Sequence, residues 1–195
     1  MSGEVRMELI VATLVLAVAV GYATGGRLSA LADLDVRWPP VAIAGLVLQS
    51  LPMPSRTLAF VALYLSFALL LLFAAVNVRR QAVPFVAILL GVALNFTVIA
   101  VNAGMPVTRD AVVASGQVDT LDELRDGGWV KHHLAGPDDR LLFLGDVIGV
   151  RQIGQIVSIG DVVAYAGVAW LVVAGMRRRR DDLTLPARLA TERAS

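Results

Sequence analysis

The chain has 195 residues, of which 57% are hydrophobic and 17% are charged. Soluble domains are about half apolar and a quarter charged, so this balance excludes an ordinary soluble domain and favours a membrane protein. The absence of cysteine excludes a disulfide, a thiol nucleophile and a lipid-modified cysteine anchor. The net charge of +1 says little, because the distribution of the charges matters more than their sum.

Five apolar segments are predicted to cross or enter the bilayer, whose hydrocarbon layer of about 30 Å takes about 20 helical residues. They lie at about residues 8–26, 39–53, 57–78, 83–103 and 157–176. The second is short, because Pro39 and Pro40 suit a helix start whereas Pro52 and Pro54 end the helix. It is either a thin, tilted span or a re-entrant half-helix. The predicted fold class is an all-α membrane protein with one helical domain over residues 1–180.

Arginine clusters predict the orientation of these segments. Arg79 and Arg80 follow the third segment, and four arginines at 177–180 follow the fifth, so the positive-inside rule places both ends in the cytoplasm. Counting back places the N-terminus and the long segment 104–156 outside, and residues 181–195 form a cytoplasmic tail. The first segment lacks a basic start, which favours a retained span over a cleaved signal peptide.

The long outer segment is predicted to be partly ordered. Thr120 followed by Glu123 is typical of a capping box that opens a short helix, which should stop at Gly127 and Gly128. Residues 141–150 are apolar except for one aspartate and are too few to span the bilayer. We expect them to lie in the membrane interface, or to dip into the bilayer and return.

A polar stripe runs along the fourth segment. Gly91, Asn95 and Asn102 are spaced so that they fall on one helix face. An asparagine in a membrane helix needs a hydrogen-bond partner, and its amide either binds a ligand or links to a neighbouring helix. The stripe ends at Asn102, directly before the irregular sequence AGMP at 103–106 on the predicted outer side. Ligand binding and a link between helices therefore both stay open.

Two Gly-Asp pairs, Gly145-Asp146 and Gly160-Asp161, follow in the chain. Paired carboxylates in a dry site can share a proton, so that one acts as an acid and the other as a base. Asp161 also has a structural explanation, because together with Ser158 it has the form of a capping box at a helix start. No comparable cap is evident for Asp146.

His132 and His133 follow Lys131 in the outer segment. Adjacent histidines lack the spacing of a metal site on a helix, so no metal is predicted. We expect Lys131 and one histidine to lie at the headgroup level, where they contact lipid phosphate or the aspartates. The sequence has no glycine-rich phosphate loop, nucleophile elbow or basic aromatic strip, and we predict neither a cofactor nor a nucleic-acid partner.

Four motifs carry a resemblance to a known family. They are the runs at 95–106, 131–133, 143–146 and 158–161, which read NFTVIAVNAGMP, KHH, FLGD and SIGD. Together they resemble the bacterial membrane family catalogued as domain of unknown function 5317. This resemblance spans most of the chain, implies that the polar residues belong together, and implies no activity. The expected location is the bacterial cytoplasmic membrane, with the lipid bilayer as a partner.

A weaker similarity links the chain to lipoprotein signal peptidase, whose catalytic aspartates lie near the outer membrane face on its last two spans. The resemblance would make Asp146 and Asp161 catalytic. The chain departs from that family's pattern, because no arginine follows Asp146, and Ile159-Gly160 stands where Val-Ala is usual.

Three functions are compatible with these features. The first is an outward-facing polar pocket that binds or translocates a small molecule or a lipid headgroup. Its predicted residues are Asn95, Asn102, His132, Asp146 and Asp161. The second is an intramembrane aspartyl-type hydrolase that uses the two aspartates. The third is a non-catalytic membrane scaffold or subunit, so the sequence leaves enzymatic activity open.

Overall fold

The computed structural model describes residues 2–125 and 131–178, and most of them are helical. The five main helices are α1 (Ser2–Ala23), α2 (Pro39–Ser50), α3 (Arg56–Val78), α4 (Ala82–Asn102) and α7 (Ile159–Met176). The short helices are η1 (Leu28–Asp33), α5 (Arg109–Ser115), η2 (Val118–Thr120), α6 (Leu121–Arg125), η3 (Leu142–Leu144) and η4 (Arg151–Ile153). The strands are β1 (Met105–Val107), β2 (His132–Leu134), β3 (Ile148–Val150) and β4 (Gln155–Val157).

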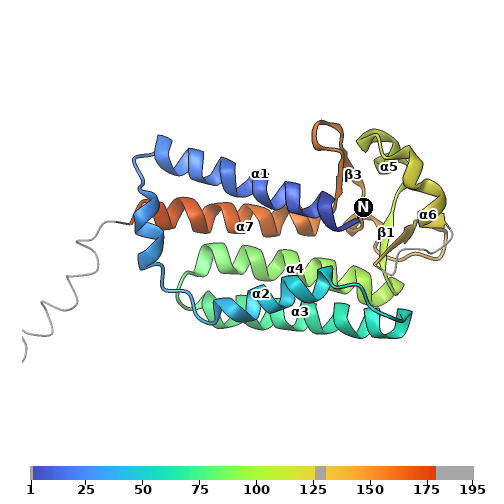
Figure 1. Cartoon of the computed structure of the whole chain (residues 1–195), viewed down its shortest axis with the longest axis horizontal. Coiled ribbons are helices and arrows are strands. Elements are labelled where there is room, and N and C mark those ends of the chain that lie inside the picture. The colour runs from blue at the N-terminus through green and yellow to red at the C-terminus, as the bar shows by residue number, and fades with distance from the viewer. Residues whose placement is uncertain (1, 126–130, 179–195) are drawn as a thin grey trace, which may run out of the picture.

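The main helices pack in the order α1, α7, α4, α3 and α2, each mainly against its neighbours in this row. Figure 1 shows that the helices alternate in direction along the chain, so the N-terminus and the segment from β1 to β4 lie at one end. The turn η1 and the C-terminal end of α7 lie at the opposite end. These relative directions agree with those expected from the arginine clusters.

The five predicted apolar segments are all helical, close to the predicted bounds. Three of these helices, α3, α4 and α7, are long and apolar enough to cross a membrane. The 12 residues of α2 extend over only about 18 Å at 1.5 Å per residue, less than the roughly 30 Å of the hydrocarbon layer. The count of five complete spans therefore stays a prediction.

The start of α2 is attached to the end of α3 by Asn77, which is fully buried. The backbone N–H of Arg37 donates to Asn77 Oδ1 at 2.6 Å, and Asn77 Nδ2 donates to the Arg37 carbonyl at 2.9 Å. An ion pair between Arg80 and Asp35 lies beside it. These contacts hold α2 and α3 together as a hairpin, although α2 is short.

Glycines permit the close contact between α4 and α7. A Cβ atom on Gly91 would lie 2.8 Å from the Ala164 Cβ, and one on Gly160 would lie 2.8 Å from the Gly91 carbonyl oxygen. Farther along α7, a Cβ on Gly167 would lie 2.8 Å from the Pro84 carbonyl oxygen. Small residues let helix backbones approach closely in membranes, and here they bring the two helices together along much of their length.

The outer segment contains two small sheets, which the all-α prediction missed. Strand β1 pairs in parallel with β2, and β3 pairs antiparallel with β4. Asp146 lies along the other side of β1, where its N–H donates to the Pro106 carbonyl at 3.0 Å and its carbonyl accepts from the Thr108 N–H at 3.1 Å. The fold class is therefore corrected to mostly helical with little sheet, because strands of three residues are too short to show a periodicity.

The predicted short helix of the outer segment is present as α6, directly after Thr120. The Thr120 hydroxyl donates to the Gln117 carbonyl at 2.8 Å. The expected stop at Gly127 and Gly128 lies outside the described residues, as do the last arginines and the tail at 179–195. The apolar residues 141–150 do not form one segment, since η3 and β3 are separated by Asp146.

We expect Gly91→Ala to destabilise the protein, because the added methyl group meets the backbone of α7. Overpacking of this kind costs about 1–3 kcal/mol, so the melting temperature in detergent should fall. Gly136→Ala is the matched control, because a Cβ there has open space and meets only the Asp139 carboxylate at 4.0 Å. Equal melting temperatures for the two variants would contradict the close packing of α4 and α7.

Candidate functional site

The start of α7 is closed by a capping box formed by Ser158 and Asp161, which confirms the structural explanation of Asp161. The Asp161 N–H donates to Ser158 Oγ at 2.9 Å, and the Ser158 N–H donates to Asp161 Oδ2 at 3.1 Å. The carboxylate also lies at the positive end of the helix dipole. The helix cap therefore explains the position of Asp161 Oδ2, and no catalytic role is needed to explain it.

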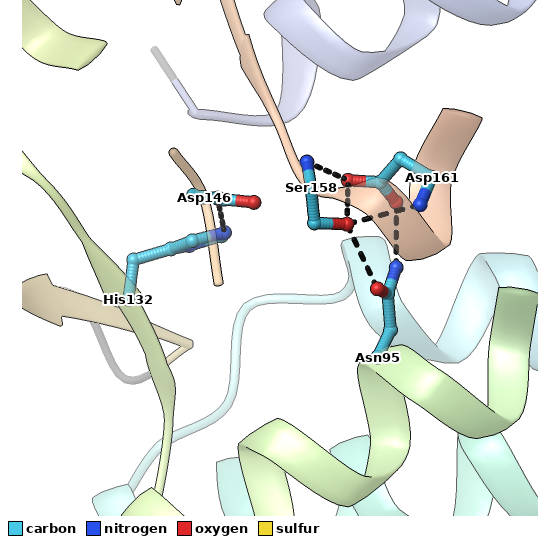
Figure 2. Close-up of polar contacts among 5 residues, drawn as sticks. All are labelled: Asn95, His132, Asp146, Ser158 and Asp161. Atoms are coloured by element: carbon cyan, nitrogen blue, oxygen red, sulfur yellow. Dashed lines mark hydrogen bonds and ion pairs between the residues drawn. The ribbon is translucent and has the colours of Figure 1, made fainter. Parts of the chain in front are cut away.

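Asn95 connects this cap to α4, as Figure 2 shows. Its Nδ2 donates to Asp161 Oδ1 at 2.7 Å, and its Oδ1 lies 2.8 Å from Ser158 Oγ, which can donate to it. Ser158 is fully buried and Asn95 is nearly so. Of the two interpretations of Asn95, these contacts favour a link between helices, because its amide oxygen and nitrogen both have partners within the chain.

Asn102, the last residue of α4, holds a different part of the chain. Its Nδ2 donates to the Arg140 carbonyl at 2.8 Å, and the Arg140 N–H donates to Asn102 Oδ1 at 2.8 Å. Nδ2 also lies 3.0 Å from the Val98 carbonyl. Asn102 thereby fixes the residues that lead into η3 to the end of α4.

His132 and Asp146 form a buried pair on the two sides of β1. The His132 Nε2 lies 3.5 Å from Asp146 Oδ2, and their side chains are only 12% and 5% exposed. The adjacent His133 makes a separate contact, with Nε2 2.9 Å from Asp139 Oδ1. A buried carboxylate is costly unless it is paired and hydrogen-bonded, so the contact with His132 lowers the cost of burying Asp146.

The five residues predicted to share a pocket fall into three sets by their contacts. Asn95 contacts Asp161, His132 contacts Asp146, and Asn102 contacts the backbone of Arg140. In Figure 2 the first two sets lie in different parts of the view and no marked contact joins them. A single pocket shared by all five stays a prediction. Among the side chains of residues 9–125 and 131–178, no three histidine, aspartate or glutamate groups are placed to hold a metal ion.

The sequence analysis did not predict two pairs of hydrogen bonds, those of Asn77 with the Arg37 backbone and those of Asn102 with the Arg140 backbone. Asn77 could have been found by its type, because an asparagine inside an apolar helix needs a partner. The partner it has, the Arg37 backbone, carries no signal in the sequence. The same holds for Asn102, whose stripe position was recognised whereas its partner at Arg140 was not.

The profile of a family of unknown function, DUF5317, matches residues 33–173. The chain belongs to the DUF5317 family. The matched range contains α2, α3 and α4, the whole outer segment, and nearly all of α7, so it includes every residue of the contacts above. No curated protein and no solved structure matches the chain significantly. Membership of DUF5317 confirms the resemblance and assigns no activity to these side chains.

We expect Asn95→Ala to lower the free energy of unfolding by about 1–3 kcal/mol, because the buried Ser158 hydroxyl and the part-buried Asp161 carboxylate lose their hydrogen bonds to Asn95. Thr97→Val is the matched control, since the exposed Thr97 hydroxyl donates only to the Ala93 carbonyl of its own helix. The measurement is an unfolding titration in mixed micelles. A double-mutant cycle of Asn95→Ala with Asp161→Ala should be non-additive. Strict additivity would show that the two side chains do not interact.

Proposed function

We propose that the chain is a multi-spanning protein of the bacterial cytoplasmic membrane, with its N-terminus outside and its C-terminus in the cytoplasm. One helical membrane domain occupies residues 1–180, and residues 181–195 form a cytoplasmic tail. Support comes from the short connections at the η1 end of the row, which are rich in arginine. These arginines are Arg27, Arg37, Arg79, Arg80, Arg177 and Arg178. The connection at the opposite end, residues 51–56, carries one arginine, Arg56, so the excess of arginine lies at the η1 end, as the positive-inside rule expects of a cytoplasmic side.

Cysteine accessibility tests this orientation, because the wild-type chain has no cysteine. We expect Val118→Cys in the outer segment to react with a membrane-impermeant maleimide in intact bacterial cells. Asp33→Cys in η1 should react only after the cells are permeabilised. The reverse pattern would overturn the proposed orientation, and labelling of both variants in intact cells would contradict the separation of the two ends by a membrane.

We further propose that the outward-facing end binds a small molecule or a lipid headgroup. The observation that carries this proposal is the burial of the His132 and Asp146 side chains against each other. Asp161 is used by a helix cap and Asn95 by a link between helices. His132 and Asp146 instead form a mostly buried ionisable pair, and pairs of this kind are common at functional sites.

The chemistry of the pair defines the ligand group. A neutral histidine donates from one ring nitrogen and accepts at the other, whereas an ionised aspartate only accepts. Together they suit a hydroxyl or an amine, which occurs in polar small molecules and in lipid headgroups. In this proposal Asn95, Asn102 and Asp161 position the surrounding elements, and a direct contact of these three with the ligand stays a prediction.

We expect Asp146→Asn and His132→Gln each to weaken ligand binding by at least about tenfold, since each variant loses a hydrogen-bonding group and leaves its buried partner unsatisfied, which costs about 1–3 kcal/mol. The probes are phosphatidylethanolamine and phosphatidylglycerol, and bound lipid is measured by native mass spectrometry of the detergent-purified protein. Asp139→Asn is the matched control, because Asp139 pairs with the neighbouring His133. Unchanged lipid binding in the first two variants, or an equal loss in the control, would contradict the site.

Mutations distinguish ligand binding from the two alternative functions, an aspartyl-type hydrolase and a non-catalytic scaffold. A hydrolase requires that Asp146→Asn and Asp161→Asn each abolish turnover with normal protein levels, so turnover in either variant removes that function. A scaffold is favoured by one observation, namely that Asn95, Asn102 and Asp161 all have partners within the chain. It requires that substitutions of these residues, and of Asp146, change only the melting temperature.

A further inference from the structure

We propose that residues 140–144, here called the outer turn, insert into the outer leaflet and bind phospholipid there. Leu141 and Phe143 would contact the acyl chains, and the Arg140 guanidinium would contact a lipid phosphate. This inference rests on the proposed membrane orientation. It is independent of the ligand site at His132 and Asp146, because it uses different side chains.

The outer turn is held at the end of the spanning helices by two contacts. Asn102 ends α4, and its side-chain amide bonds both the N–H and the carbonyl of Arg140. Leu144 packs on a hydrophobic cluster between α3 and α4. The buried members of that cluster are Leu63, Phe67, Val98, Ile99 and Met105. Because α3 and α4 are long enough to cross the bilayer, the outer turn lies where those helices leave it.

Two apolar side chains of the outer turn are left uncovered by the chain. Phe143 is 62% exposed and Leu141 is 38% exposed, whereas Leu144 between them and the bundle is packed. Val101, next to Asn102 in the last turn of α4, is also exposed. Exposed apolar area costs about 25 cal/mol per Å² in water. Acyl chains in contact with Leu141 and Phe143 would remove this cost for the outer turn.

Arg140 lies directly before these apolar residues and its side chain is exposed. Its backbone groups are both held by Asn102, so its position is fixed whereas its long side chain can extend. An arginine next to an apolar insertion places its stem along the hydrocarbon and its charge at the phosphates. The adjacent Asp139 is already engaged by His133 and by the Gly136 N–H, and Asp138 is the remaining exposed acidic neighbour.

Single-cysteine variants of the cysteine-free chain test the insertion. We would label Phe143→Cys with bimane and reconstitute the full-length protein in phosphatidylcholine and phosphatidylglycerol vesicles with brominated acyl chains. Bromine quenches a fluorophore only on contact, so bimane at 143 should lose at least about half of its fluorescence, as expected for a group in the hydrocarbon. Leu90→Cys, exposed in the middle of α4, is the positive control, and Val118→Cys in the outer segment is the negative one.

The outcomes at position 143 either support or overturn the proposal. Quenching close to that of Leu90→Cys supports it. Fluorescence that matches Val118→Cys shows that water or another protein chain covers Phe143, and it overturns the insertion. Because the bimane at 143 reports lipid contact directly, this result does not depend on whether His132 and Asp146 bind a ligand.

Arg140→Cys tests the depth of the outer turn, and it keeps the backbone contacts with Asn102. The fluorescence of bimane at this position should not be quenched by the brominated acyl chains, and it should be quenched by iodide in the aqueous phase. Quenching by the brominated lipids to the same extent as at 143 would overturn the placement of Arg140 at the phosphates.

Arg140→Gln with bimane at 143 should reduce lipid quenching in vesicles that contain phosphatidylglycerol. Unchanged quenching there would overturn the phosphate contact.

Discussion

The close contact between α4 and α7 is the constraint on which the rest of the structure depends. These helices are far apart in the chain, and the whole outer segment lies between the end of one and the start of the other. Gly91 and Gly160 let the backbones meet, and Asn95 then reaches the cap at Ser158 and Asp161. Asn95 and Ser158 are buried, and these hydrogen bonds satisfy polar groups that would otherwise be costly to bury. Because the outer segment follows α4 and precedes α7, the packing of these two helices brings its two ends together.

The sequence predicted the helices well and the outer segment poorly, for a physical reason. Apolar length is a local signal, and it located the five main helices. Ser158 and Asp161 are three residues apart, so their cap was also readable. The parallel pairing of β1 with β2, and the bond from Asn102 to Arg140, join distant residues and leave no pattern at either position. Asn95, Asn102 and the two aspartates were found and Asn77 was not, and most of the partners of these residues were missed.

The polar residues of the chain therefore divide into two kinds. Asn77, Asn95 and Asn102 bond to groups of other elements, and each holds one junction of the fold. His132 and Asp146 pair with each other at the boundary between the bundle and the outer segment. Membership of DUF5317 covers both kinds equally, so it does not separate structural from functional residues. The proposed ligand site therefore rests on the pairing of His132 with Asp146.

The row of helices has a consequence for permeation. A water-filled channel needs helices that surround it on all sides, so the first and last helices of such an array must meet. Among the helices that the structure describes, α1 and α2 stand at the two ends of the row and pack against α7 and α3, not substantially against each other. The row is open. A continuous aqueous route across the bilayer would therefore be bordered partly by this chain and partly by lipid or by a second chain, and conduction would depend on assembly.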